Sequence, residues 1–247
     1  MSRSIRGSLV ALVVINILGA QGPDSLGVSF APSKASLSLS VPMQIIVLLT
    51  LLAVLPALMM SVTPFLRITV VLHFLRQALS TQGTPSNQVL IGLALFLTLV
   101  IMQPVGTDMY HKGWEPFEAG QATWQQAWKD GSQPLKTFLL RYVREKDVRL
   151  FLDISHTPAP HDRSELGLGV LMPAYVLSEL KTGFQIGAIL FLPFLGIDLV
   201  VASVTLSIGM VQLPPVMLSA PFKILLFVLV DGWNLVIGSL MRSFYPS

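Results

Sequence analysis

Residues 186–211 read IGAILFLPFLGIDLVVASVTLSIGMV, an apolar run in which Asp198 is the one charged residue. About 20 apolar residues in a helix cross the hydrocarbon core of a bilayer. Three further runs have the same character, at 43–62, 89–105 and 224–240. The last of these contains a single charge, Asp231. The four runs predict a membrane protein whose apolar segments fall into two pairs.

The composition of the whole chain agrees with this prediction. Hydrophobic residues make up 53% of 247 residues, charged residues make up 12%, and the mean hydropathy is +0.70. A soluble domain carries roughly 25% charged residues, so lipid or partner subunits must cover this chain. The net charge of +3 is spread over several loops, which excludes the basic footprint of a nucleic-acid-binding protein. The absence of cysteine excludes disulfides, thiolate metal sites and cysteine nucleophiles.

The first 20 residues predict a signal peptide. Arg3 and Arg6 form a basic start, residues 9–18 form a short apolar run, and Gly19 and Ala20 are small enough for cleavage. An uncleaved interfacial anchor is the alternative. Residues 21–41 are rich in Ser, Gly and Pro, which predicts a flexible periplasmic lead-in.

The rest of the chain divides at the apolar pairs. We predict a first helical hairpin at 42–106, a periplasmic helical segment at 107–185, and a second helical hairpin with the C-terminus at 186–247. No stretch shows the alternation of apolar and polar residues that is typical of a strand. The predicted fold class is therefore all-α, an integral membrane-type protein of two long kinked helical hairpins with a helical periplasmic segment between them.

Charge asymmetry predicts the orientation of the hairpins. The loop at 63–88 holds Arg67 and Arg76 and no acid, and the short second loop ends at Lys223. The positive-inside rule places both loops in the cytoplasm. The segment 106–185, with nine basic and ten acidic residues, then lies outside with both termini, in the periplasm of a Gram-negative cell.

The external segment contains one clear amphipathic helix. Ser132 suits its N-cap and Pro134 its first turn. Apolar side chains then recur at helical spacing, at Leu135, Phe138, Leu139, Tyr142 and Val143. This helix needs a partner surface for its apolar face.

Ionisable side chains inside apolar segments are functional candidates, and Asp198 and Asp231 are of this kind. One interpretation is a proton pathway, and the other is an ion pair between helices or subunits. Lys223 is the obvious partner: Asp198 lies 14 residues before Gln212 and Lys223 lies 11 after it, so a hairpin brings them to similar depth. Glu179 is much farther from this turn and meets Lys223 only across a subunit boundary.

Prolines and glycines also fall inside the predicted helices. Pro56, Pro104 and Pro193 each remove a backbone hydrogen bond, so we expect them to kink or break their helices. Such breaks are tolerated at membrane depth where protein or a water-filled cavity satisfies the freed carbonyls. Gly183 and Gly187 have the spacing of a close helix contact.

No pattern of residues predicts catalysis or a bound cofactor. His156 and His161 lie near Asp153 and Asp162, but in a Pro-rich loop without the defined spacing of a metal site, so we interpret them as a solvated loop. Phosphate-binding loops, Ser-His-Asp order and HExxH patterns are not found.

Longer strings show a resemblance to a known family. Residues 173–188 read PAYVLSELKTGFQIGA and residues 221–233 read PFKILLFVLVDGW, and both resemble signatures of the FliP family of flagellar type III export proteins. Three other stretches match in the same order, at 87–98, 191–203 and 238–245. The injectisome counterparts, the SctR family, share this core. The signal peptide, the long external segment and the C-terminal ending favour the flagellar branch.

The resemblance implies a non-enzymatic role. Members of the FliP family form a ring of identical subunits, a pentamer, that joins FliQ and FliR in the export gate of the flagellar basal body. FlhA and FlhB are neighbouring partners, and unfolded rod, hook and filament subunits pass through the channel. The implied location is the bacterial inner membrane and its periplasmic side, where lipid and other subunits cover the hairpins.

The resemblance also suggests roles for single residues. Many relatives carry a run of methionines before the paired prolines, described as a gasket of the closed channel, whereas residues 209–213 here read GMVQL. Met210 is carried over to this role, and Gln212 would add a polar group to the gasket. Four ionisable residues match family positions, namely Glu179, Asp198, Lys223 and Asp231. We predict that Lys223 pairs with Asp198 or, between subunits, with Glu179.

Two other functions remain alternatives to a channel subunit for protein export. A small-ion or proton channel is supported by Asp198 and Asp231 alone. A secondary transporter would be built from repeats, but no substrate-binding constellation is found between the two hairpins. An intramembrane enzyme lacks a nucleophile with its base or a metal pattern.

Overall fold

The computed structural model describes residues 41–245 except 82, 159, 161 and 211–213. The predicted signal peptide at 1–20 and almost all of the lead-in at 21–41 lie outside these residues. The chain divides into two units, 1–56 and 57–247, and α2 (Val41–Val62) runs from the first unit into the second.

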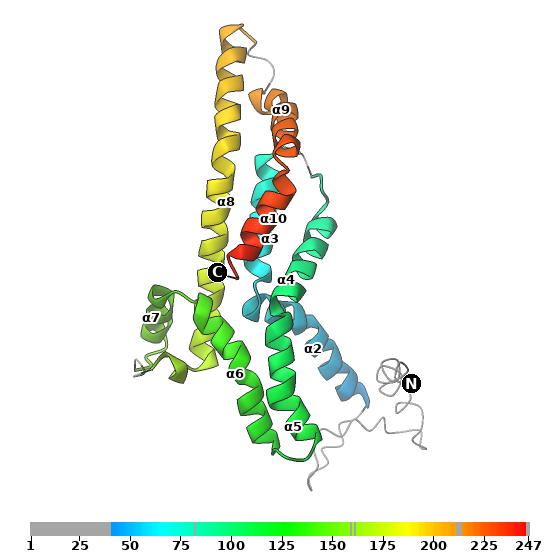
Figure 1. The fold of residues 1–247 in the computed structure, drawn as a ribbon, viewed down its shortest axis with the longest axis vertical. Helices are drawn as coiled ribbons and strands as arrows, with labels where there is room; N and C mark the ends of the chain where they lie inside the picture. The colour runs from blue at the N-terminus through cyan, green and yellow to red at the C-terminus, as the bar shows by residue number, and fades with distance from the viewer. Residues whose placement is uncertain (1–40, 82, 159, 161, 211–213, 246–247) are drawn as a thin grey trace. The chain divides into compact units, whose positions relative to one another are not determined.

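Helices account for the regular structure of the described residues, which confirms the all-α, membrane-type prediction. After α2 come α3 (Phe65–Ala78), α4 (Asn87–Met109), the π-helical turn η1 (Tyr110–Trp114), α5 (Glu115–Glu118), α6 (Trp124–Tyr142) and α7 (Glu145–Ile154). The short 3₁₀ turn η2 (Arg163–Glu165) then leads into α8 (Leu168–Ser207), α9 (Pro215–Leu229) and α10 (Gly232–Arg242). Figure 1 shows α8 as the longest helix, with α3 and α9 packed along it.

Three helices among the described residues are long and apolar enough to cross a membrane. They span Pro42–Val62, Asn87–Glu118 and Leu168–Ser207. A fourth span would have to be built from α9 and α10, which are bent by 66° at their junction.

That bend corrects the prediction of one continuous segment at 224–240. Asp231 lies at the N-cap of α10 in the left-handed region, with φ 51° and ψ 52°. The next residue, Gly232, has no room for a side chain, because a Cβ there would lie 2.2 Å from the ring of Phe227. Hydropathy alone gives no sign of this break, since the bend involves the backbone conformation of Asp231 and the close contact of Gly232 with Phe227.

The predicted loop at 63–88 is also wrong in part, because it contains α3. The apolar side chains of this helix recur at helical spacing and are buried, at Ile68, Val71, Leu72 and Leu75. Ile68, Val71 and Leu72 belong to a core to which α4, α6, α8 and the C-terminal residues contribute, whereas Leu75 packs in a second cluster with Phe194 and Phe227. The two arginines suggested an exposed cytoplasmic loop, but Arg67 is 4% exposed.

The amphipathic helix of the external segment is α6, and it begins earlier than predicted. Thr123 forms a capping box with Gln126, so Ser132 and Pro134 lie inside the helix. The predicted apolar face is confirmed, since Phe138, Leu139 and Val143 are buried. Gly131 contacts Gly113 of η1 so closely that a Cβ on either would lie about 3 Å or less from the other's Cα.

The prolines predicted to kink or break helices lie inside continuous helices. Pro56 is within α2, Pro104 within α4 and Pro193 within α8. Each of these helices is continuous through its proline, so of the two predicted outcomes a kink is the one that stays open. A continuous helix tolerates the missing hydrogen bond when its neighbours are intact, and bending at these sites stays a prediction.

Candidate functional site

Three ion pairs among the described residues include a buried charge, and each has one partner on α8. Two of them lie near residues 179–181, and the third lies roughly 28 Å further along the helix at a rise of 1.5 Å per residue. Burying a charge is costly unless it is paired and hydrogen-bonded, so these pairs fix how other segments pack on α8.

The first pair joins α3 to α8. Arg67 Nε donates to Glu179 Oε2 at 2.9 Å, and Arg67 Nη2 donates to Glu179 Oε1. Glu179 has no exposed side-chain surface. The parallel two-bond arrangement is the strong, directional form of an arginine–carboxylate pair.

The remaining face of Arg67 is held by the C-terminal end of the chain. Its Nη1 donates to Ser243 Oγ at 3.2 Å, and its guanidinium carbon lies 4.1 Å from the centre of the Phe244 ring. The ring of Tyr142 lies 5.6 Å away, and its hydroxyl donates to the backbone carbonyl of Phe244 at 2.6 Å. A cation over aromatic faces gains further stabilisation when it is shielded from water.

The second pair joins α7 to α8. Lys181 Nζ donates to Asp147 Oδ1 at 2.9 Å, and Ser178 Oγ donates to Asp147 Oδ2 at 2.8 Å. Burial favours the neutral carboxyl, but the bonds from Lys181 and Ser178 outweigh it and hold the pKa of Asp147 below its ordinary value. The Ser178 hydroxyl also accepts from the backbone N–H of Arg144 at 3.0 Å, which fixes the start of α7.

The third pair joins α9 to α8 and contains two predicted residues. Lys223 Nζ donates to Asp198 Oδ2 at 2.7 Å, and Ser219 Oγ donates to Asp198 Oδ1. Lys223 also donates to Ser80 Oγ at 3.0 Å, which ties the segment after α3 to the hairpin. The structure thus brings Lys223 to the first of its two predicted partners, while Glu179 has a partner in its own chain.

Asp231 lies apart from these pairs. It is exposed, and its Oδ2 accepts a hydrogen bond from Asn234 Nδ2 at 3.1 Å. None of the ion pairs formed by the described residues includes it. Its backbone conformation at the bend, rather than a charge partner, is its visible contribution.

The two predicted packing glycines lie where α8 meets α3. A Cβ on Gly187 would lie 2.6 Å from Cγ of Phe74, and a Cβ on Gly183 would lie 3.1 Å from the side chain of Val70. Both glycines are buried. The helices therefore approach at a distance that a larger residue at 187 would not allow.

The predicted gasket residues belong to the connection between α8 and α9. Gly209 has φ +80°, which ends the turn after α8, and Met210 is 43% exposed. Gln212 lies outside the described residues. The role of both residues in a gasket stays a prediction.

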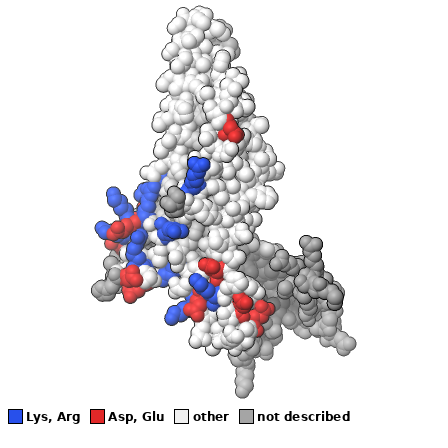
Figure 2. Space-filling model, viewed as in Figure 1, with Lys and Arg blue, Asp and Glu red and all other residues white. Residues whose placement is uncertain are grey.

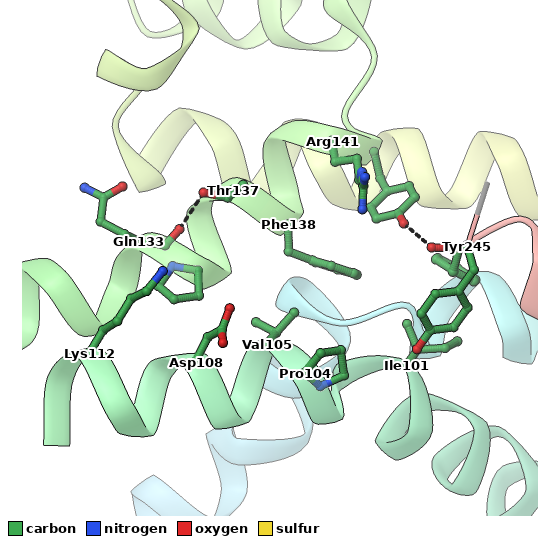
Figure 3. Close-up of a pocket in the computed structure, with 13 residues that line it drawn as sticks. Ile101, Pro104, Val105, Asp108, Lys112, Gln133, Thr137, Phe138, Arg141 and Tyr245 are labelled. Atoms are coloured by element: carbon green, nitrogen blue, oxygen red, sulfur yellow. Dashed lines mark hydrogen bonds between the residues drawn. The ribbon is translucent and has the colours of Figure 1, made fainter. Parts of the chain in front are cut away.

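A pocket of about 430 Å³ lies between α4 and α6, next to the C-terminal residues. Asp108 and Lys112 line it from one side, Arg141 from the other, and Tyr245 from its end (Figure 3). Of the predicted site residues, Pro104 alone lines it. Two of its aromatic lining residues, Tyr142 and Phe244, also contact Arg67.

Charged side chains and bare apolar surface occupy different parts of this unit. On the face shown in Figure 2, Lys, Arg, Asp and Glu gather over α5, α6 and α7, whereas the far end built by α8 and α9 is almost free of charge. Large apolar side chains are exposed there, including Leu199, Leu206, Val228 and Leu229 at 61–74%. A surface of this kind requires lipid or another chain to cover it.

The loop with His156 shows no gathered ligand set. His156 follows α7 with φ 50°, and His161 lies outside the described residues. Within the part of the chain that the structure describes, no three His, Cys, Asp or Glu side chains are close enough together to hold a metal ion.

Sequence reasoning missed Arg67, Asp147, Tyr142 and Phe244. Arg67, Asp147 and Phe244 lie in or next to polar stretches, where exposure is the default expectation, and Tyr142 was predicted on an apolar helix face but without a polar partner. The available signal was the sequence of α3, since an arginine on the apolar stripe of a helix requires an acidic partner.

Comparisons with known proteins identify a family for this chain. The family model described as "FliP family" matches residues 48–240. A Flagellar biosynthetic protein FliP of Pectobacterium carotovorum is 48% identical over 208 residues, which cover 84% of this chain and 81% of that protein. The protein of the same name from Bacillus subtilis is 45% identical over 230 residues, covering 93% and 98%, and that of Treponema pallidum is 46% identical over 203 residues, covering 81% and 75%. On this similarity, which extends over most of its length, the chain belongs to the FliP family.

Proposed function

We propose that this chain is a channel-forming core subunit of the flagellar type III protein export gate. In this proposal, copies of the chain form a ring with FliQ and FliR, and unfolded flagellar proteins pass through it across the inner membrane. FlhA and FlhB homologues are neighbours on the inner membrane and its periplasmic side. Membership of the FliP family supports the flagellar part of the proposal.

The exposed apolar surface of α8 and α9 carries the structural part of the proposal. Leu199 is 62% exposed on α8 and Val228 is 68% exposed on α9. The same helices are held to each other from inside by the Lys223–Asp198 pair. A hairpin that is internally fixed and externally apolar is suited to packing side by side with further hairpins, as a ring around a channel requires.

The connection between α8 and α9 is the proposed position of the gate. Met210 supplies a flexible thioether side chain that adapts to irregular gaps, and Gln212 adds a polar group. Gly209, with φ +80°, follows α8 directly before Met210. A gasket with one methionine would seal through apolar contacts from neighbouring copies more than through sulfur.

A small-ion or proton channel is the second candidate, and Asp198 is the residue that decides against it. Both carboxylate oxygens of Asp198 accept hydrogen bonds, one from Lys223 and one from Ser219. A carboxylate held in this way is suited to a structural pair rather than to carrying protons. Asp198→Asn should therefore impair assembly, whereas a proton channel would assemble normally and lose flux.

The first experiment is co-expression with FliQ and FliR homologues, purification through a tag on this chain, and measurement of the mass of the complex. The proposal expects one large assembly with several copies of this chain and both partners. A monomer or dimer without partners, under conditions that preserve membrane complexes, would contradict it.

A further inference from the structure

We propose that Arg67 and Tyr142 act as positioning residues that clamp a C-terminal arm, Gly232–Tyr245, and thereby set the direction of α9 in the gate-bearing hairpin. The contacts that carry this inference all lie within one chain. Its consequence for gating rests on the proposed function, but the arrangement of the arm does not.

The clamp acts on two consecutive residues of the arm. Arg67 Nη1 donates to Ser243 Oγ at 3.2 Å, and the guanidinium lies over the ring of Phe244 at 4.1 Å. Glu179 accepts two bonds from the other edge of the same guanidinium, which restricts rotation of the plane over which Phe244 lies. One buried arginine thus orients both α8 and the arm.

Tyr142 fixes the same part of the arm from the opposite element, α6. Its hydroxyl donates to the carbonyl oxygen of Phe244 at 2.6 Å, and the two rings meet edge to face with centres 5.3 Å apart. Phe244 is 2% exposed, and Leu240 one helical turn earlier is also 2% exposed. Side chain, ring and backbone of the arm are therefore each held by a different contact.

The position of the arm is transmitted to α9 through a bend that has little freedom. Asp231 takes the left-handed conformation, and Gly232 lies so close to Phe227 that a Cβ would be 2.2 Å from its ring. Trp233 packs edge to face on the same ring, with centres 5.5 Å apart. Because Phe227 belongs to α9, a displacement of the arm requires a displacement of α9.

The hairpin then follows α9. Ser219 and Lys223 of this helix hold Asp198 of α8, and Lys223 also reaches Ser80. The C-terminal arm, the bend at Asp231 and the Lys223–Asp198 pair thus form a continuous series of contacts. This series connects the core around Arg67 with the hairpin whose connecting segment holds Met210.

A pair of spin labels measures this coupling directly. The natural chain has no cysteine, so Lys146→Cys on α7 and Val228→Cys on α9 supply the only labelling sites, and both natural side chains are exposed. The distance distribution is measured on the full chain in its purified membrane complex, with the labelled chain diluted by unlabelled chain so that most complexes hold one labelled copy and distances between copies do not contribute. We expect one narrow peak for the parent, and its loss, as broadening or a second population, when Phe244→Ala removes the clamped ring.

Two further variants test whether the effect depends on the contacts of Phe244 with the clamp. Tyr142→Phe keeps the ring in the core and removes only the bond to the Phe244 carbonyl, so a smaller broadening is expected. Tyr245→Ala is the matched control, because this neighbouring aromatic is 49% exposed and its hydroxyl makes a single bond to the Val100 carbonyl at 3.3 Å. It should leave the peak unchanged.

The mass of each labelled complex is measured in parallel, which separates the two proposals. A parent chain that forms no ring contradicts the proposed function and leaves the distance measurement valid for the chain alone. If Phe244→Ala fails to fold, the distance distribution of the Tyr142→Phe variant is the test of the inference. The inference is overturned if the folded variants give the same narrow peak as the parent, or if Tyr245→Ala broadens the peak as much as they do.

Discussion

The two ends of α8 differ in how they meet their surroundings. Near its start, Ser178, Glu179 and Lys181 bond to α3 and α7 of the same chain, and the charges there are buried or satisfied. Further along, Asp198 accepts hydrogen bonds from Lys223 and Ser219 of α9, and the helix beyond it exposes large apolar side chains such as Leu199. The first end is completed by its own chain, whereas the second requires other molecules to cover it.

This difference separates stability from assembly. A substitution at the charged end should act on folding of the single chain, because its partners are always present. A substitution at the hairpin should act through contacts with other subunits as well, so its effect should depend on whether those subunits are there. The predictions below test this separation.

The largest expected effect is at Glu179. Glu179→Ala leaves Arg67 as an uncompensated buried charge, which costs about 3–5 kcal/mol when one partner of a buried pair is removed. The thermal unfolding midpoint of the purified chain should fall steeply. Glu145→Ala is the control, because it removes an exposed partner of Arg149 and such pairs contribute about 0.3–0.5 kcal/mol. Equal losses in both variants would contradict the account.

The next effect is at Lys223. Lys223→Ala leaves Asp198, whose side chain is 18% exposed, without its cation, so we expect a loss of about 3 kcal/mol, at the lower end of the range for buried pairs. Because the pair orients α9, export in a motility or secretion assay should fall with it. Full export by a normally assembled Lys223→Ala complex would show that this pairing does not matter.

The close contact of α8 with α3 predicts a smaller effect. Gly187→Ala places a Cβ against the ring of Phe74, and overpacking of this kind costs about 1–3 kcal/mol. Gly196→Ala in the same helix meets nothing within 4 Å and should be neutral or stabilising by up to about 1 kcal/mol, since alanine favours a helix. Unfolding midpoints of the two variants should shift in opposite directions or differ clearly, and a matching shift would rule out a tight contact at 187.

The sequence predicted those parts of the fold that depend on runs or regular spacing of apolar residues. The all-α class follows from hydropathy, and the apolar face of α6 follows from spacing at Phe138 and Leu139. The break at Asp231 was not predictable, because a left-handed residue next to a crowded glycine leaves no trace in hydropathy. The helix α3 was overlooked because the positive-inside rule assigned its two arginines to a cytoplasmic loop, although its apolar residues recur at helical spacing.

The candidate site was predictable only for residues that stand out against an apolar background. Asp198 and Lys223 are charges inside long apolar segments, and counting from the turn was enough to pair them. Arg67 and Phe244 are 177 positions apart, and their contact depends on the bend that returns the arm to the core. Single-sequence patterns carry no information on such long-range contacts.

The smallest expected effect is the pH dependence from Asp147. Its lowered pKa means that the folded state favours the carboxylate, so this contribution to stability is fully present above the ordinary aspartate pKa of about 4 and is lost as the pH falls through the lower folded value. The difference in unfolding midpoint between the parent and Asp147→Asn should shrink between about pH 6 and pH 3. Asp153→Asn, at an exposed position of α7, should show no such trend. If the difference in unfolding midpoint between the parent and Asp147→Asn stays constant over this pH range, the lowered pKa of Asp147 is contradicted.

The most direct test of the central claim asks what covers the hairpin. A photo-crosslinking amino acid is placed at Leu199 on α8 or Val228 on α9, and at exposed Lys146 on α7 for comparison, in membranes that contain the assembled gate. The account predicts that both hairpin positions crosslink to another protein subunit in high yield. If neither position crosslinks to protein while the complex has its full mass, lipid alone covers the hairpin, and its proposed place in a ring of subunits is wrong.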